Sequence, residues 1–251
     1  MLTEPILFKK INLIEAPLDY KWNRTIEDKL RNGDNQRLEE LLDKCNYKSV
    51  FGLGIAASEW VFWRFKQWRV ELEGKNIDDL MLLVEALWIG LIDKNYLRNP
   101  EHDMDYIKGN KIESIVWYFL NQYISTRHYY RTSSVRLYLD VSHYIMIAQH
   151  ISPDPKAFES WLTNCLKRMI ELFPNEQIDE DGGIDRSYDV NQEPFIPREF
   201  YFDPEFDYET ADLQKMSNIL LTQADYINNP YLLSPEKVIE KGFIGTPYQP
   251  K

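Results

Sequence analysis

The segment from Ser49 to Leu72 is apolar around most of its circumference, and this pattern constrains the fold more strongly than any other in the chain. At helical spacing its large apolar residues occupy several faces instead of one stripe. A helix of that kind is buried on several sides at the centre of a protein. We therefore expect this segment to form the central helix of the core. Its large apolar residues are Phe51, Ile55, Phe62 and Phe65 on one face, with Trp60, Trp63 and Trp68 widening that face.

Most of the remaining chain also repeats apolar residues at helical spacing, and no segment shows a reliable strand alternation. The pattern predicts an all-α fold of six or seven helices, arranged as a bundle or as a stack of helix hairpins. We expect one domain, residues 1–251, and buried side chains at Phe62, Trp88, Phe119 and Trp161. The seven main helical segments are 25–45 with an interruption near Gly33, 49–72, 76–92, 110–123, 134–150, 152–173 and 213–227, and a further short one is expected at 234–241.

Polar residues in front of these segments predict where several helices begin. Asn76, Asn110, Ser152 and Ser234 are of the types that accept a hydrogen bond from the first turn of a helix. Residues 1–24 are expected to form short strands or an extended arm that packs on the body. Residues 98–110 should form a polar loop, and residues 245–251 an extended tail.

An acidic–aromatic segment, residues 176–212, combines thirteen carboxylates with seven aromatic rings and only two basic residues. Disordered acidic tails are poor in aromatics, so we expect this segment to be ordered. One interpretation makes it the docking surface for a basic protein. The other makes it an internal strap over the cations Arg64, Lys66, Arg69, Arg127 and Arg131. The candidate partner-binding residues are Asp179, Glu180, Asp181, Asp185, Asp189, Glu199, Tyr201, Phe202, Asp203 and Glu205.

The acidic balance of the chain limits its partners. A net charge of −11 and an isoelectric point of about 4.9 disfavour non-specific binding to nucleic acid or to anionic membranes. The longest apolar run, Leu80 to Ile92, is too short to cross a bilayer, and the N-terminus lacks the pattern of a signal peptide. We therefore expect a cytoplasmic protein in which Cys45 and Cys165 are buried free thiols.

Two motifs resemble ligand sites but lack essential parts. Gly52 to Ala57 matches the dinucleotide fingerprint G-x-G-x-x-A, yet its surroundings have helical period, and the fingerprint requires a preceding strand. The glycines are better explained by the close approach of two helices. Gln177 to Tyr188 resembles a calcium loop without the required acids at its first and last positions. We expect no cofactor and no metal.

Asp140 and His143 lie one helical turn apart and are a candidate acid–base pair, with His150 on a similar face. The simpler interpretation is a hydrogen bond between Asp140 and His143 at the surface of the bundle. Cations also alternate with aromatics in Trp60–Arg69 and Arg127–Arg131, as in single-strand binders. We favour core rings whose cationic neighbours extend to water.

An acidic, helical chain without a catalytic motif resembles the immunity proteins of bacterial polymorphic toxin systems, including type VI secretion, Rhs and contact-dependent inhibition systems. The C-terminal runs Asn229–Glu236 and Lys241–Tyr248 are similar to the end of such a protein. The resemblance implies a protein that is not an enzyme and that neutralises a cognate, basic toxin, such as a nuclease, by covering its active site. The alternatives are a helical enzyme using Asp140 and His143, or a helical scaffold.

Overall fold

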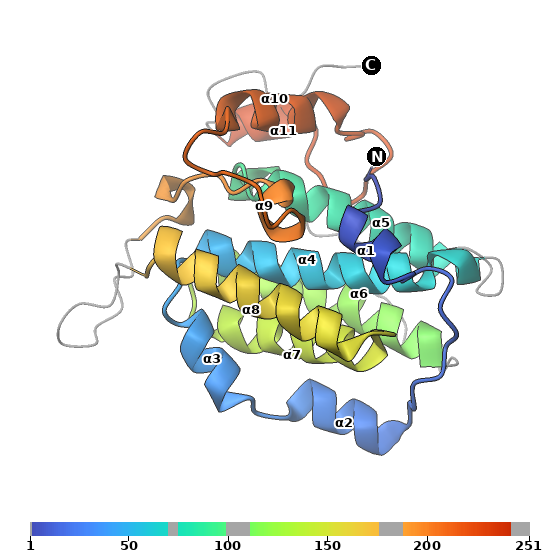
Figure 1. Ribbon diagram of the computed structural model, residues 1–251. Helices are drawn as coiled ribbons and strands as arrows, with labels where there is room; N and C mark the ends of the chain where they lie inside the picture. Colours follow the sequence, from blue (N-terminus) through green and yellow to red (C-terminus); the bar gives the residue numbers. More distant parts are fainter. Residues whose placement is uncertain (1, 70–74, 99–110, 176–187, 242–251) are drawn as a thin grey trace.

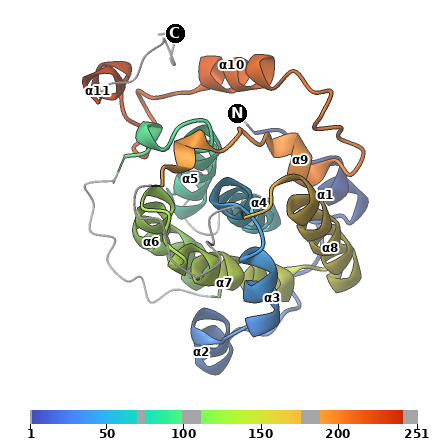
Figure 2. The same ribbon diagram turned by 90° about the vertical axis from the view of Figure 1, so that its left-hand side faces the viewer.

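Helix α4 (Tyr47–Phe65) lies at the centre of the computed structural model, with the other helices arranged around it (Figures 1 and 2). The structure describes residues 2–69, 75–98, 111–175 and 188–241. All nineteen residues of α4 are buried, as its circumferential apolar pattern predicts. The all-α prediction is confirmed: the described residues form helices and two isolated bridges, Cys45–Pro174 and Leu97–Leu232, and no strand.

Ten further α-helices surround α4 within the described ranges. In chain order they are α1 (Ile6–Lys10), α2 (Arg24–Asn32), α3 (Gln36–Leu42), α5 (Lys75–Gly90), α6 (Lys111–Arg131), α7 (Arg136–Ile151), α8 (Pro155–Leu172), α9 (Arg198–Phe202), α10 (Leu213–Gln223) and α11 (Pro235–Glu240). Three 3₁₀ helices accompany them: η1 (Lys66–Arg69), η2 (Lys94–Tyr96) and η3 (Val190–Gln192).

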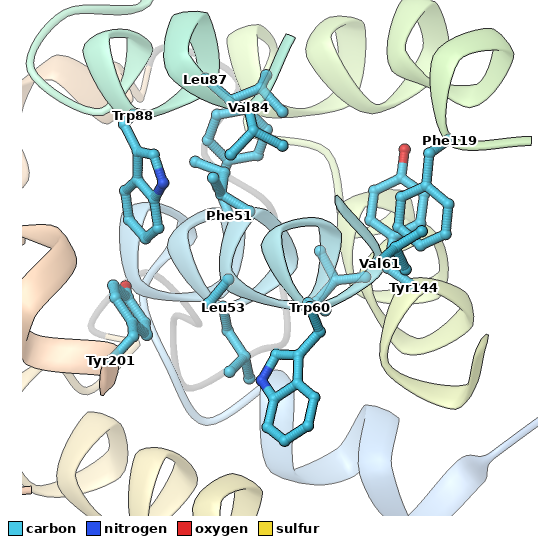
Figure 3. Close-up of a cluster of buried hydrophobic side chains, with 14 of the residues drawn as sticks. Phe51, Leu53, Trp60, Val61, Val84, Leu87, Trp88, Phe119, Tyr144 and Tyr201 are labelled. Carbon is cyan, nitrogen blue, oxygen red and sulfur yellow. The ribbon is translucent and has the colours of Figure 1, made fainter. Parts of the chain in front are cut away.

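Aromatic rings from distant parts of the chain meet on α4 (Figure 3). The Trp60 ring lies 4.8 Å, centroid to centroid, from both Phe8 of α1 and Phe158 of α8. On another face the Phe51 ring stacks on Tyr130 of α6 at 4.0 Å. Such aromatic pairs contribute about 0.5–1.5 kcal/mol each beyond the burial of their area. The four predicted core residues, Phe62, Trp88, Phe119 and Trp161, are all buried.

The N-terminal residues are held against the body by a buried arginine on α4. Arg64 donates hydrogen bonds to the carbonyl oxygens of Leu13, Ala16 and Pro17, and also to that of Ile151 at the end of α7. The prediction of short strands in this region is wrong, because residues 6–10 form α1 and bury Phe8. A short apolar run such as Ile6–Phe8 fits either element, and packing against α4 selects the helix.

Several predicted helix ends differ from those observed. The N-cap of α8 is Asp154, whose carboxylate accepts from the Ala157 backbone N–H at 3.0 Å, and not Ser152. Helix α10 ends at Gln223, earlier than predicted. The cap at Ser234 is confirmed, whereas the caps at Asn76 and Asn110, the loop up to residue 110 and the tail at 245–251 lie outside the described residues or side chains. The described residues also contain more helices than the six or seven predicted, because short helices such as α1 and α9 leave almost no periodic signal.

The glycines of the G-x-G-x-x-A motif lie inside α4 and permit close packing, as the helical interpretation predicts. A Cβ on Gly52 would overlap the buried Tyr201 ring, and one on Gly54 would stand 2.8 Å from a methyl group of Val141. Both contacts are tighter than those that real Cβ atoms make. The motif therefore serves helix packing, with no strand before it among the described residues.

Replacing Gly52 by Ala is expected to lower the free energy of unfolding by about 1–3 kcal/mol, because Tyr201 is fully buried and has no room to move away. Urea unfolding followed by circular dichroism measures the loss. As the control, Gly52→Ala/Tyr201→Leu is compared with Tyr201→Leu alone, and the smaller side chain should reduce the cost of the added Cβ. Stability equal to that of the unmodified protein in the Gly52→Ala variant would contradict the tight contact.

Candidate partner-binding surface

The structure describes the acidic–aromatic segment from residue 188 onwards. Residues 176–187, with the predicted binding residues Asp179, Glu180, Asp181 and Asp185 and most of the calcium-loop resemblance, lie outside the described residues. In residues 188–193, the side chains of Asp189 and Glu193 form an ion pair and hydrogen bonds, respectively, with the body of the protein. Residues 199–212 run along the surface from α9 to α10 (Figure 2).

The carboxylate of Glu193 is buried at the beginning of α4. It accepts hydrogen bonds from the backbone N–H groups of Tyr47 and Lys48 at 3.1 and 2.5 Å, and from the hydroxyl of Tyr188 at 2.8 Å. A negative charge is favourable at the N-terminus of a helix. Burial nevertheless raises the pKa of Glu193, and burial lowers the pKa of Lys48 to about 8. This part of the segment is structural.

The strap interpretation holds for residues 188–193, but with different cations from those predicted. Asp189 forms an ion pair with Lys94 at 2.8 Å, and although burial opposes it, the hydrogen bond from Lys94 keeps the pKa of Asp189 below its usual value. Arg64, Arg127 and Arg131 instead donate to backbone carbonyl oxygens, Lys66 lies over the Trp63 ring, and the side chain of Arg69 is not described.

Helix α9 turns its three aromatic side chains, Phe200, Tyr201 and Phe202, into the protein. The hydroxyl of Tyr201 donates to the carbonyl oxygen of Ser49 at 3.0 Å, and its own carbonyl accepts from Trp161 Nε1 at 2.7 Å. The prediction that Tyr201 and Phe202 anchor a partner therefore needs correction: both rings belong to the core, with exposed fractions of 2% and 8%.

A single arginine on α8 fixes the backbone that follows α9. Arg168 donates to the carbonyl oxygens of Phe200, Asp203 and Phe206 at 2.8, 3.2 and 2.6 Å, and its guanidinium lies over the Phe200 ring. Because Arg168 binds carbonyl oxygens, its hydrogen bonds leave the carboxylates of this loop directed to solvent. The backbone of this loop is therefore held in place by hydrogen bonds from the body of the protein.

The exposed carboxylates of this loop follow one another closely along the chain, and we call them the acidic ridge. It contains six acidic residues within fourteen positions and no lysine or arginine. Asp203, Asp207 and Asp212 also accept backbone N–H bonds that form the turns and cap α10, and hydrogen bonds from Thr210 lower the pKa of Asp207. The members of the ridge are Glu199, Asp203, Glu205, Asp207, Glu209 and Asp212.

A buried ion pair lies below the beginning of the ridge. Glu59, whose side chain is fully buried in α4, accepts hydrogen bonds from Trp63 Nε1, Trp88 Nε1 and the guanidinium of Arg198. Arg198 also donates to the carbonyl oxygen of Thr3. The pair was not among the residues predicted from the sequence. Its signal was the only carboxylate in the mostly apolar helix α4, since a buried charge requires a partner.

The sequence predicted that Asp140 is hydrogen-bonded to His143, but its hydrogen-bond donors lie on α6 instead. The buried Asp140 carboxylate accepts from Gln122, Ser125 and Thr126 of α6, at 2.9, 3.4 and 2.8 Å. Burial raises the pKa of Asp140 and lowers that of His143, so both side chains are shifted towards their neutral forms. The two residues do line one cavity of about 430 Å³ between α6 and α7.

The remaining candidate groups lie apart from one another. His150 sits between Tyr20 and Trp22 with its Nε2 2.6 Å from the carbonyl oxygen of Lys21. Cys45 and Cys165 are buried free thiols, as predicted, and burial raises the pKa of each to about 12. Within the described part of the chain, no three His, Cys, Asp or Glu side chains gather as they would around a metal ion.

Comparison with protein families, curated proteins and solved structures finds no match to this chain. Among the described residues, no helix is both long enough and apolar enough to span a bilayer. Function is therefore inferred from the acidic ridge and its surroundings.

Proposed function

We propose that this chain is an immunity-type binding protein that neutralises a cognate basic toxin by covering the toxin's active site with the acidic ridge. The observation that supports this proposal is the geometry of the ridge. Its six carboxylates face solvent, while the backbone between them is held by Arg168 and by buried rings. A surface fixed in this way loses little conformational entropy when a partner binds.

The chemistry of the ridge suits a partner whose active site binds phosphate groups. Carboxylates spaced along an ordered loop can accept hydrogen bonds from the lysines and arginines that otherwise hold a nucleic-acid backbone. Such charges chiefly accelerate association and select the partner, whereas desolvated apolar contacts chiefly slow dissociation. A nuclease is therefore the class of toxin that the ridge fits best.

The proposal is tested with the protein encoded next to the gene of this chain. Expressed alone in a bacterial host, that protein is expected to stop growth, and co-expression of this chain is expected to restore it. The two purified proteins should also form a complex in size-exclusion chromatography. Toxicity that this chain does not relieve, together with the absence of a complex, would refute the proposal.

Replacing the ridge glutamates tests directly whether the charge of the ridge accelerates association with the basic partner. Neutralising Glu199, Glu205 and Glu209 to Gln is expected to slow association with the basic partner about tenfold or more at low salt and to flatten its salt dependence. These residues are chosen because the ridge aspartates also stabilise turns and the α10 cap. Surface plasmon resonance at several salt concentrations measures both rate constants.

A matched variant separates this local effect from net charge. Asp28, Asp34 and Glu40 are exposed on and between α2 and α3, on the side of the molecule opposite to α9 and α10 (Figure 1). Replacing these three with Asn, Asn and Gln changes the net charge by the same amount and should leave association almost unchanged. Equal slowing in both triple variants would show that total charge, and not the ridge, steers the partner.

A further inference from the structure

A cavity of about 380 Å³ lies beneath α10, and we call it the α10 cavity. Met216, Ile219 and Leu220 line it from α10, and Ile89 and Phe195 line it from the body of the protein. Figure 2 shows α10 outermost, above α5. The volume falls in the range of sites that enclose a small ligand or a large side chain.

Helix α10 leaves much of its apolar surface unburied. Of its eleven residues only Ser217 and Leu221 are buried, and Ile219 is 48% exposed while it also lines the cavity. A monomeric protein seldom leaves an apolar hollow open beside exposed aliphatic side chains unless something binds there. The shape and the lining therefore indicate a binding site for an apolar group.

The charges around the cavity indicate what carries that apolar group. Glu85, Glu199 and Asp225 contribute carboxylates to the lining, and among the described lining residues Arg198 contributes the only guanidinium. Arg198 is engaged by Glu59 and by the carbonyl oxygen of Thr3, while Glu85 accepts from the Leu2 backbone N–H and Asp225 accepts from Asn228, so the three carboxylates still outnumber the one guanidinium. The surroundings are therefore negative, and a cation beside the apolar group would be favoured over an anion.

The cavity is continuous with the acidic ridge. Glu199 is both the first residue of the ridge and part of the cavity lining, and the last ridge residue, Asp212, caps α10 itself. A partner segment bound at Glu199 would thus also border the cavity. This continuity distinguishes the α10 cavity from the cavity beside Asp140, which lies between α6 and α7.

We propose that the α10 cavity receives one large apolar side chain of the basic partner, flanked in the partner by lysine or arginine residues that meet the ridge. This inference rests on the proposed function and adds the anchor that the ridge alone lacks. Apolar side chains that fill a pocket at the centre of an interface carry most of its binding energy. Tyr201 and Phe202 are buried in the core, so they do not anchor a partner. The anchoring side chain comes instead from the partner, and the α10 cavity receives it.

The test uses two short synthetic peptides rich in lysine and arginine, one with a single central leucine and one with alanine in its place. Fluorescence anisotropy with the full chain is expected to show about tenfold tighter binding of the leucine peptide, since burying the larger side chain contributes about that factor. Ile219→Ser should abolish most of this preference. Ile227→Ser is the matched control, because Ile227 is 72% exposed and does not line the cavity.

The outcomes separate the two proposals. Equal binding of the leucine and alanine peptides, weakened by neutralising the ridge glutamates, would overturn the cavity anchor and support the ridge. Binding of neutral N-acetyl-leucinamide as tight as that of the leucine peptide would show a small-molecule pocket and overturn the anchor. No binding of either cationic peptide, with a complex of the full-length partner that is insensitive to ridge neutralisation, would overturn both proposals.

Discussion

Replacing Arg198 by Met is expected to lower the free energy of unfolding by about 3–5 kcal/mol, one of the largest effects of any single substitution in this protein. Methionine keeps most of the aliphatic bulk but leaves the fully buried Glu59 carboxylate without its cation. The two Trp N–H donors that remain do not neutralise a charge. Urea unfolding monitored by circular dichroism gives the difference directly.

The control for this prediction removes the charge that the substitution leaves behind. In the double variant Arg198→Met/Glu59→Gln, no buried charge remains, although the single amide oxygen can accept from only one of the two Trp N–H groups, which donate to different oxygens of Glu59. This variant should recover more than half of the lost stability, because the penalty arises mainly from an unpaired charge. If the double variant is as unstable as Arg198→Met, then the lost packing of Arg198 against Phe202 is the cause.

Replacing Trp88 by Ala is expected to cost about 3–5 kcal/mol, because its ring is buried between α4 and α9 (Figure 3) and the substitution leaves a large cavity. The ring lies 5.7 Å from that of Tyr201, centroid to centroid, and its Nε1 donates to Glu59 at 3.1 Å. Thermal unfolding followed by calorimetry measures the loss.

Trp88→Phe separates packing from hydrogen bonding at this position. Phenylalanine keeps one buried aromatic ring but loses the N–H donor and part of the indole volume, so about 1–2 kcal/mol of the loss should remain. Ile239→Ala is the control for a general effect of truncation, since Ile239 is 56% exposed on α11 and should change stability by less than about 0.5 kcal/mol. A comparable loss in Trp88→Ala and Ile239→Ala would contradict the placement of Trp88.

The sequence alone predicted the long elements and the central helix because their signal is local and repeated. The apolar circumference of residues 49–72 and the stripes around Trp88 and Phe119 each give a helical period over several turns. Helices α1 and α9 are only five residues long and give no such period. Their conformation is determined by what they cover on α4.

The candidate site was predictable in its composition but not in its orientation. Six carboxylates alternating with aromatic rings indicate an ordered acidic segment, yet the sequence does not state which ring faces inwards. That choice depends on Ser49, Trp161 and Arg168, all more than thirty residues away in sequence. The Glu59–Arg198 pair spans 139 residues, a separation at which neither residue type nor spacing indicates a partner.

The complete burial of α4 also determines the order in which the protein can fold during synthesis. The helix is covered partly by α1, which is made before it, and partly by α9, which ends at Phe202. At a ribosomal rate of about 5–20 residues per second, the interval between Phe65 and Phe202 lasts on the order of ten seconds. Throughout that time a predominantly apolar helix has no complete cover, so the nascent chain exposes its most aggregation-prone element until α9 has been made.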